Sequence, residues 1–345
     1  MQKINLLIIG DFNKGNSSNF IYKAFSKVVN KIYKSDDDST KQMWGKKSFF
    51  YRVMWKLKLP IDNKKHNKLI IKYIDDKKVN TIMIIKGNHI KPSTLKYAKN
   101  NNINLLSWSD DDMFNRGNRS YYYDWGLKYY DIVVTQKSYN CNIDELPSLG
   151  AKHVFFRNKA YDKDTHKPYD CSENKYNFDV LFIGHFEEER YKSMLYLAKN
   201  GIKIDIFGPA WDKYININKN LVIHNKMLVA DEYANALSCT KISLCFLRKV
   251  NRDLQTSRTM EIPSCGGFMM AERTREHIGL FEEDKEAVFF DNNNELLEKV
   301  IYYLNNDDKR IDIAKNGRFR CENSPYSYDD RATEIIEELM RITND

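Results

Sequence analysis

Short apolar runs alternate with stretches of helical periodicity along the first half of the chain. Each run is bounded by Gly, Asp or Asn, which is typical of parallel strands buried on both faces. The stretches between the runs predict helices, one of which begins at Pro92, where proline is tolerated. Residues 34–40, KSDDDST, predict a solvated loop. We expect strands at residues 4–9, 81–85, 103–107, 132–135 and 153–156, and helices at residues 19–29 and 67–75.

The same alternation resumes in the second half, after a polar segment at residues 162–174 that we interpret as a linker. Two successive β-α-β series predict two doubly wound domains, so the expected fold class is α/β. We set these domains at residues 1–165 and 166–325, and expect a helix in residues 326–345 to return to the first domain. We expect strands at residues 178–183, 203–207, 221–223, 242–246, 268–270 and 287–290, and helices at residues 187–199, 231–238, 257–263, 294–305, 308–320 and 328–341.

Residues 49–59 mix aromatic side chains with Arg52, Lys56 and Lys58. We favour a helix that packs one face on the sheet. The alternative is a basic amphipathic surface that contacts an acceptor or a membrane.

Composition agrees with a folded protein of two domains. The chain has 345 residues, of which 42% are hydrophobic and 30% charged, and no apolar run is long enough for a membrane helix. Its start, MQKINLLIIGDF, resembles a first strand rather than a signal peptide, so we expect a cytoplasmic protein. The net charge of +8 either favours anionic partners or reflects the Lys- and Asn-rich composition.

The spacing of the cysteines predicts neither a disulfide framework nor a zinc site. They form no CxxC pair, and no histidine pair lies nearby at zinc-finger spacing. We therefore expect neither a disulfide framework nor structural zinc, but buried free thiols. The six cysteines are Cys141, Cys171, Cys239, Cys245, Cys265 and Cys321.

Several short motifs follow one another in the second half. They are FIGHFEEER, GPAW, EYANAL, SRTMEIPSCGGFMMAERT, FEEDKEAVFFD, IAKNGR and YSYDDR, between residues 182 and 331. In this order they resemble the glycosyltransferase group 1 superfamily, and within it the CgeB-like, spore-maturation-type branch. The first half matches more loosely, through WSDDD at residues 108–112 and YDIVVTQK at residues 130–137.

The resemblance implies a GT-B enzyme, with two Rossmann-like domains facing across a cleft. The C-terminal domain would bind a nucleoside diphosphate sugar of UDP or GDP type, and the N-terminal domain an acceptor. Such transferases generally need no metal for donor binding, so we expect no metal and no cofactor.

The resemblance also assigns two carboxylates that frame the donor. Glu261 matches the residue that binds the ribose hydroxyls, and the plain alternative is a helix-start carboxylate that accepts free N–H groups. Asp253 stands eight positions earlier, where the superfamily usually has a glutamate that contacts the transferred sugar. Its alternative role is in a turn or a helix cap.

Cations and glycines are expected around the diphosphate. Arg190 and Arg258 are the favoured phosphate ligands, because the guanidinium fork suits phosphate oxygens. The Gly266-Gly267 turn either lets the backbone approach the nucleotide or ends the preceding helix. The remaining candidates are Gly184 and His185 after the first strand of the domain, Arg248 and Arg252 as either ligands or surface charge, and Asn225, Lys226 and Met227 beside the base.

The acceptor side has weaker candidates. Gly10 and Asp11 follow the first strand, in a loop that lacks both GxGxxG and a GK[ST] ending. His89 ends another strand and could contact sugar or phosphate, although a lone histidine is mostly structural. Asp110 and Asp111, followed by Asp112, form either an acidic cleft edge or a solvated loop, and a base among them would serve only an inverting reaction.

The function that we expect is transfer of a sugar from the nucleotide donor to an acceptor hydroxyl, with retention and without metal, in glycan or surface polysaccharide synthesis. The acceptor would be a glycan, a lipid-linked glycan or another hydroxyl compound, with peripheral contact to the inner membrane face as an option. One alternative is a nucleotide-sugar epimerase or phosphorylase. The other is a non-catalytic nucleotide-sugar or nucleic-acid-associated protein, or a transferase that modifies DNA.

Overall fold

The computed structural model describes residues 3–36, 49–172 and 176–344. They belong to two compact units, which are Met1–Asn158 with Tyr328–Asp345 (unit 1) and Lys159–Ser327 (unit 2). Unit 2 therefore begins inside the domain that we had set at residues 1–165. Asp162 and His166, in the segment expected as a linker, are buried in unit 2.

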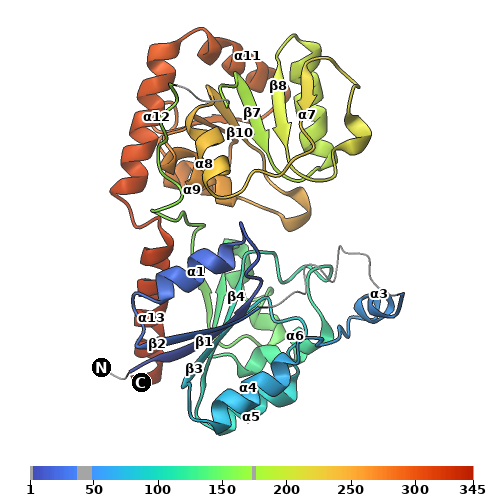
Figure 1. Cartoon of the computed structure of the whole chain (residues 1–345), viewed down its shortest axis with the longest axis vertical. Helices are drawn as coiled ribbons and strands as arrows, with labels where there is room; N and C mark the ends of the chain where they lie inside the picture. Colours follow the sequence, from blue (N-terminus) through green and yellow to red (C-terminus); the bar gives the residue numbers. More distant parts are fainter. Residues whose placement is uncertain (1–2, 37–48, 173–175, 345) are drawn as a thin grey trace. The chain divides into compact units, whose positions relative to one another are not determined.

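Unit 1 contains a parallel sheet of six strands in the order β2-β1-β3-β4-β5-β6 (Figure 1). The inner strands are buried on both faces, as their continuous apolar runs predict. Because all strands run in one direction, their carboxyl ends meet along one edge. The strands are β1 (Asn5–Gly10), β2 (Lys31–Asp36), β3 (Thr81–Ile85), β4 (Asn104–Ser109), β5 (Ile132–Thr135) and β6 (Val154–Phe156).

Strand β2 was not expected from the sequence. Its residues KIYKSD are partly or fully exposed, because β2 lies at the edge of the sheet and pairs only with β1. An edge strand needs no apolar run, and its lysines are typical of a protected edge. The prediction of a loop at residues 34–40 is wrong for residues 34–36, and residues 37–40 lie outside the described residues.

Helices cover both faces of the first sheet. Ile70 of α4 and Leu95 of α5 pack in one apolar cluster with Leu7 and Ile82 of the strands. Helix α13 packs against α1, so the end of the chain belongs to unit 1 (Figure 1). The helices are α1 (Ser17–Phe25), α3 (Phe49–Lys56), α4 (His66–Asp75), α5 (Pro92–Asn100), α6 (Tyr121–Gly126) and α13 (Tyr328–Asn344).

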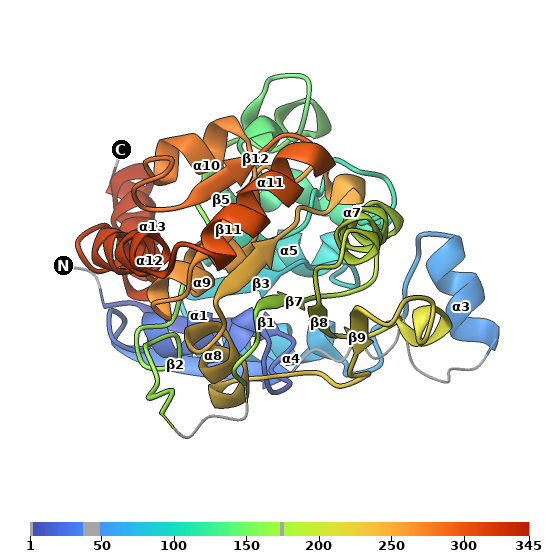
Figure 2. The ribbon, with the colours of Figure 1, turned by 90° about the horizontal axis from the view of Figure 1, so that it is seen from above.

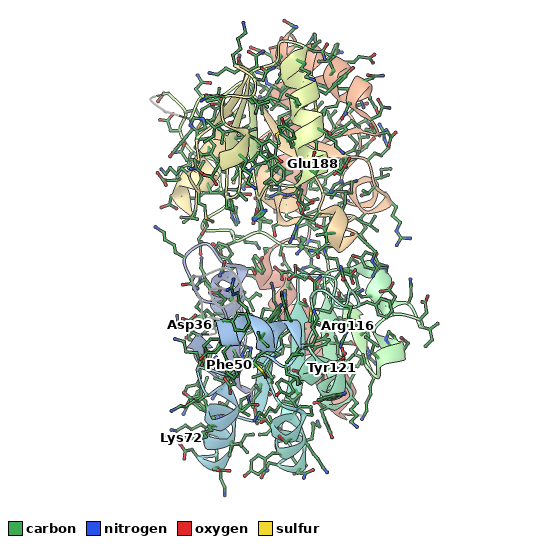
Figure 3. All side chains as sticks on the ribbon, turned by 90° about the vertical axis from the view of Figure 1, so that its right-hand side faces the viewer. Asp36, Phe50, Lys72, Arg116, Tyr121 and Glu188 are labelled. Atoms are coloured by element: carbon green, nitrogen blue, oxygen red, sulfur yellow. A yellow bond between two sulfur atoms is a disulfide. The ribbon has the colours of Figure 1, made fainter. Side chains whose placement is uncertain are left out.

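Helix α3 corrects one interpretation. We favoured a helix that packs on the sheet, but no residue of α3 is buried. Phe49 is 75% exposed and Phe50, labelled in Figure 3, is 60% exposed. Phe49 and Phe50 therefore lie outside the core of unit 1, and the other apolar side chains of α3 are only partly buried.

Unit 2 repeats the architecture with a second parallel sheet in the order β12-β11-β10-β7-β8-β9, which can be followed in Figure 2. Each of its strands was expected from an apolar run in the sequence. The strands are β7 (Val180–Ile183), β8 (Ile204–Phe207), β9 (Leu221–Ile223), β10 (Ile242–Cys245), β11 (Met269–Glu272) and β12 (Val288–Phe290).

Alternate side chains of the second sheet enter two separate cores. Val180 and Phe182 pack with α7 and α11, whereas Leu181 and Ile183 pack with α8 and α9. This division follows from the two-residue period of a strand. The helices are α7 (Glu188–Lys199), α8 (Asp231–Ser238), α9 (Ser257–Ser264), α10 (Arg275–Leu280), α11 (Asn293–Leu304) and α12 (Asp307–Glu322).

A disulfide joins Cys171 to Cys239 in unit 2. The expectation of free thiols is therefore wrong for these two residues, which are 68 positions apart in sequence and carry no motif that announces the pairing. The bond ties the segment that follows His166 to the end of α8. The other four cysteines are free, and Cys245, Cys265 and Cys321 are buried as expected.

No helix in the described part of the chain combines the length and the apolar character that crossing a bilayer requires.

Candidate functional site

The carboxyl ends of β7 and β10 lie side by side in the second sheet and carry the strongest candidates. The turn after β7 leads into α7, which holds Arg190, and the loop after β10 leads into α9, which holds Arg258 and Glu261. Ligands of open α/β sheets bind at such an edge. The fold thus gathers at one edge residues that are 71 positions apart in sequence.

Arg190 lies almost entirely inside this edge and is 3% exposed. Its guanidinium donates to the carbonyl oxygens of His185 (3.0 Å), Leu247 (3.2 Å) and Phe246 (3.5 Å). Burial, and then the neighbouring Arg258 charge, lower the pKa of Arg190 to about 10, so it stays charged at neutral pH. Arg190 therefore fastens the turn after β7 to the loop after β10.

Arg258 reaches the same point from α9. Its two terminal nitrogens donate to the carbonyl oxygens of Ile183 and Phe246, each at 3.1 Å. Among the described residues, its buried Nε–H has no acceptor. Both guanidinium groups lie over the ring of Phe182, with Arg190 5.7 Å and Arg258 5.4 Å from its centroid. Two like charges thus share one carbonyl and one aromatic face, an arrangement that an anion would stabilise.

Glu261 lies within α9 rather than at its start. The helix begins at Ser257 after a capping box of Thr256 and Thr259, so Glu261 has no role in satisfying free N–H groups. Its carboxylate accepts a hydrogen bond from the hydroxyl of Tyr233 at 2.6 Å. Burial and the nearby Glu261 charge raise the pKa of Tyr233 well above its usual value, which keeps this donor protonated.

His166 is a neighbour of Glu261 that the sequence did not indicate. Its Nδ1 accepts from the backbone N–H of Asp162 at 3.0 Å, so the neutral ring carries its proton on Nε2. That Nε2 lies 3.8 Å from Glu261 Oε1, and the ring meets Tyr233 edge to face with centroids 6.1 Å apart. Tyr233 thus holds the carboxylate by a hydrogen bond, and His166 packs beside both side chains. A histidine in a polar stretch expected as a linker gave no signal of this contact.

The loop after β10 holds the other acidic candidate. Asp253 is 8% exposed, and its Oδ2 accepts from the backbone N–H of Arg248 at 3.3 Å. The side chain of Arg248 is paired with Glu187 at 2.8 Å. Arg252 is exposed in the left-handed conformation that ends the short 3-10 turn Lys249–Asn251. Asp253 thus helps to shape the loop, whereas both arginines point to its surface.

The residues expected near the base lie after β9. Lys226 pairs with Glu232 at 2.9 Å, and its carbonyl accepts from the backbone N–H of Gly208. Asn225 has a positive φ of 45°, and Met227 is 62% exposed. His185 is exposed as well. These residues share the carboxyl edge with Arg190, but no described contact joins their side chains to Arg258 or Glu261.

The two glycine positions have different roles. Gly208 (φ +136°) has no room for a side chain, because an added Cβ would lie 2.1 Å from the carbonyl oxygen of Gly184. Gly266 (φ +74°) ends α9 in the left-handed conformation, and with Gly267 precedes β11. Gly266 and Gly267 therefore fit the alternative of a turn that ends the preceding helix, and their approach to the nucleotide stays a prediction.

The candidates in unit 1 also follow strand ends. Gly10 ends β1, Asp11 comes next, and His89 lies in the turn after β3. Asp11 accepts from the backbone N–H of Asn13 at 3.0 Å, which shapes the loop after β1. His89 is 5% exposed and packs against the ring of His66, with centroids 5.3 Å apart.

The aspartates after β4 have distinct contacts. Asp111 pairs with Lys86 at 2.6 Å, and Asp110 lies 3.8 Å from the same ammonium. Asp112 is fully buried and accepts from the backbone N–H groups of Phe114 and Asn115. Asp110 and Asp111 thus remain at the edge of the sheet beside a lysine, and Asp112 supports the turn.

A family model described as glycosyl transferase-like matches residues 190–337. The match begins at Arg190 and contains Asp253, Arg258 and Glu261. It therefore covers most of unit 2 and the first part of α13. None of the curated proteins that were searched matches the chain.

Solved structures similar to the chain extend over nearly its whole length. Anabaena HepE in complex with UDP and glucose has a TM-score of 0.66 and 10% identity, and the likeness covers 98% of this chain and 99% of HepE. Sucrose-phosphate synthase from Thermosynechococcus elongatus has a TM-score of 0.65 and 10% identity, covering 99% of both chains. An alpha-glucosyltransferase in complex with UDP and a mismatched 13-mer DNA has a TM-score of 0.63 and 12% identity, covering 99% of this chain and 100% of that chain.

At these identities the likeness bears on the fold. Together with the two parallel six-stranded sheets, it confirms the predicted GT-B architecture of two Rossmann-like α/β units. The model described as glycosyl transferase-like matches most of unit 2, and this similarity agrees with the prediction of a glycosyltransferase.

Proposed function

We propose that the protein is a glycosyltransferase that takes a sugar from a nucleoside diphosphate donor held at the carboxyl edge of the second sheet. The observation that carries this proposal is the meeting of Arg190 and Arg258 at the carbonyl of Phe246, with Glu261 one helical turn beyond Arg258. Two guanidinium groups suit a diphosphate, and a fixed carboxylate suits the paired hydroxyls of a ribose.

The chemistry assigned to these residues is mainly positioning and charge neutralisation. Negative charge grows on the diphosphate as the glycosidic bond breaks, and Arg258, whose buried Nε–H faces no protein acceptor in the described part of the chain, would stabilise it. Arg190 holds the two loops on which this geometry depends. We assign Asp253 to the transferred sugar and propose a retaining reaction without metal at the donor, as the resemblance to group 1 enzymes and the CgeB-like branch implies.

We propose UDP as the nucleotide, because HepE was solved with UDP and with glucose. The loop with Asn225, Lys226 and Met227 lies at the same sheet edge as the arginines, where it could meet the base. Lys226 forms a surface ion pair with Glu232 in this region.

The acceptor hydroxyl is assigned to unit 1, beside Gly10, Asp11, Asp110 and Asp111. The exposed apolar side chains of α3 lie next to Arg52 and Lys56, which suits a lipid-linked acceptor or peripheral contact with a membrane. A cytoplasmic location stays a prediction from the sequence. The disulfide between Cys171 and Cys239 weighs against it, since such bonds persist mainly in oxidising compartments.

Calorimetry with UDP, GDP and their glucose conjugates tests the proposal. We expect one base to bind clearly more tightly than the other, and labelled UDP-sugar to release UDP only when an acceptor is present. No binding of either nucleotide would contradict the donor site. Conversion of a labelled donor without an acceptor would favour the epimerase alternative, and salt-sensitive DNA binding without donor turnover would favour the non-catalytic one.

A further inference from the structure

Three metal-ligating side chains meet in unit 1, away from the residues assigned above to the donor. They are Asp62 in the loop before α4, His66 at the start of α4, and His89 in the turn after β3. One ligand atom from each lies within 4.8 Å of the other two. His66 and His89 are 1% and 5% exposed, and Asp62 is partly buried.

Neighbouring polar groups hold these side chains in place. Ser35 Oγ lies 3.2 Å from His66 Nδ1, so an Nδ1–H that donates to this oxygen leaves the lone pair on Nε2. Asn67 donates through its side-chain amide to Asp62 Oδ2 at 2.7 Å and to the carbonyl of His89 at 3.0 Å. One buried amide thus fixes both the carboxylate and the turn that carries the second imidazole. Such outer partners are typical of built metal sites.

Asp62 retains coordination capacity. Its Oδ2 accepts two hydrogen bonds from Asn67, whereas its Oδ1 accepts one, from the backbone N–H of His66 at 2.8 Å. A carboxylate oxygen has two lone-pair sites, so Oδ1 keeps one for a cation.

We propose that Asp62, His66 and His89 form a binding site for a divalent transition metal of the zinc type. Two imidazoles and one carboxylate are a common ligand set for Zn²⁺ with a fourth position left for water or another ligand. In a tetrahedron with bonds of about 2.0–2.1 Å, ligand atoms lie about 3.4 Å apart. The side chains would therefore have to close by about 1.4 Å at most, which small rotations of the imidazoles supply.

The residues around the site determine how a metal ion reaches it and how tightly the ion binds. Asp62 and Asn67 line a cavity of 320 Å³, which gives a metal a path from solvent to the carboxylate. Lys65, Lys68 and Lys91 line the same cavity, and their charges oppose a cation while favouring an anion at its fourth position. We therefore expect micromolar affinity, weaker than that of a structural zinc site. The expectation of no metal came from the family resemblance, and the sequence carries no signal of this cluster because its residues meet only after β3 and α4 have packed.

Cobalt spectroscopy on the full chain tests the site without reference to sugar transfer. After chelator treatment, Co²⁺ titration should give a visible d–d band of tetrahedral type with one Co²⁺ per chain, and Zn²⁺ should abolish the band. Zinc should also raise the thermal unfolding temperature at metal concentrations above its Kd.

Variants of the ligands and of an outer partner should lose Co²⁺ affinity to different extents. His66→Gln and His89→Gln should each weaken Co²⁺ binding more than about 100-fold, and Ser35→Ala about tenfold, as for an outer-shell partner. The matched control is His153→Gln, because His153 is the third histidine of unit 1 and is bonded to a carboxylate, Glu338, at 2.6 Å.

Circular dichroism tests whether each variant is folded. If one of the two ligand variants does not fold, the other still decides the question. Absence of a band in the folded wild-type chain would overturn the proposal. So would equal Co²⁺ affinity in wild type, His66→Gln and His89→Gln.

Discussion

The carboxyl edges of the two sheets have the same architecture but differ in charge. At the edge of unit 2, Arg190 and Arg258 donate to main-chain carbonyls, and their charges remain available to an anion. At the edge of unit 1, Asp110 and Asp111 face Lys86, so charge is largely balanced within the protein. A parallel sheet supplies the place for a ligand, and the loops decide which ligand it attracts.

The contrast also separates two kinds of arginine. Arg190 and Arg258 hold the backbone through partly or fully buried contacts, whereas Arg248 forms an ion pair in which its side chain is 44% exposed. An exposed pair contributes little to stability or binding. We therefore expect the effect of each arginine on ligand binding to depend on how deeply it is buried, and not on how many arginines the edge carries.

The largest expected effect comes from Arg258→Ala. The change removes two hydrogen bonds between strand ends and one charge beside the proposed diphosphate, so kcat/KM should fall by about 100- to 1,000-fold. Steady-state kinetics with thermal unfolding separates catalysis from folding. Arg248→Ala is the matched control and should stay within about threefold of wild type. A stronger effect of Arg248→Ala than of Arg258→Ala would reverse the comparison.

A second test concerns the carboxylate of α9. Glu261→Ala should raise the Kd of the nucleotide by about 10- to 100-fold, and Tyr233→Phe by about 3- to 10-fold, because the phenol only orients the carboxylate. Calorimetry measures both. Tyr169→Phe is the control, since its hydroxyl bonds to Asp231 at 2.9 Å rather than to Glu261. Unchanged nucleotide affinity in folded Glu261→Ala would remove the ribose assignment.

Asp253→Asn addresses the sugar contact. Asparagine keeps an acceptor for the N–H of Arg248, so the loop should survive and donor Kd should change by less than about twofold. The loss of charge should lower kcat by about tenfold if Asp253 contacts the reacting sugar. Single-turnover rates beside binding constants give the two quantities. A variant with normal kcat would leave Asp253 with a purely structural role.

The smallest effect is expected from a drop in pH. It concerns the contribution to stability of two carboxylates that lie outside the proposed sites. The hydrogen bond from Arg341 lowers the pKa of Glu338 in unit 1 to about 2, and that from Arg273 does the same for Glu295 in unit 2. Both folded pKa values lie below the ordinary 4.5. Their stabilisation is therefore present above pH 4.5 and is lost as the pH falls toward 2.

Urea unfolding of Glu338→Gln and Glu295→Gln at pH 6 and pH 3 measures these contributions. Each variant should lose less than about 1 kcal/mol at pH 6, with a smaller difference at pH 3. A loss that grows on acidification would contradict the sign of the shift.

Much of the fold could be predicted because buried parallel strands leave continuous apolar runs. All strands of unit 2 and the inner strands of unit 1 have this signal. Strand β2 lacks it, because an edge strand is solvated and its pairing depends on β1 rather than on its own composition. Helix α3 has an amphipathic pattern, but the pattern does not say whether the apolar face meets protein or solvent.

Only those residues of the candidate site that share a short sequence motif could be predicted. Glu261 and Arg258 lie three positions apart on α9, and a short sequence contains both. His166 and Tyr233 meet Glu261 through packing between distant segments, which leaves no local trace. The same reason hides the disulfide and the cluster around His66. Gly266 shows that a residue of a motif can also serve a turn, since it follows the end of α9 with a positive φ.

The return of α13 to unit 1 has a consequence for synthesis. Unit 2 is one continuous segment, whereas unit 1 is closed by the last residues of the chain. At about 5–20 residues per second, unit 1 waits roughly ten to thirty seconds on the ribosome for the helix that packs against α1. Unit 2 can complete its core during that interval. During that interval the surface of α1 that α13 covers stays exposed in the nascent chain.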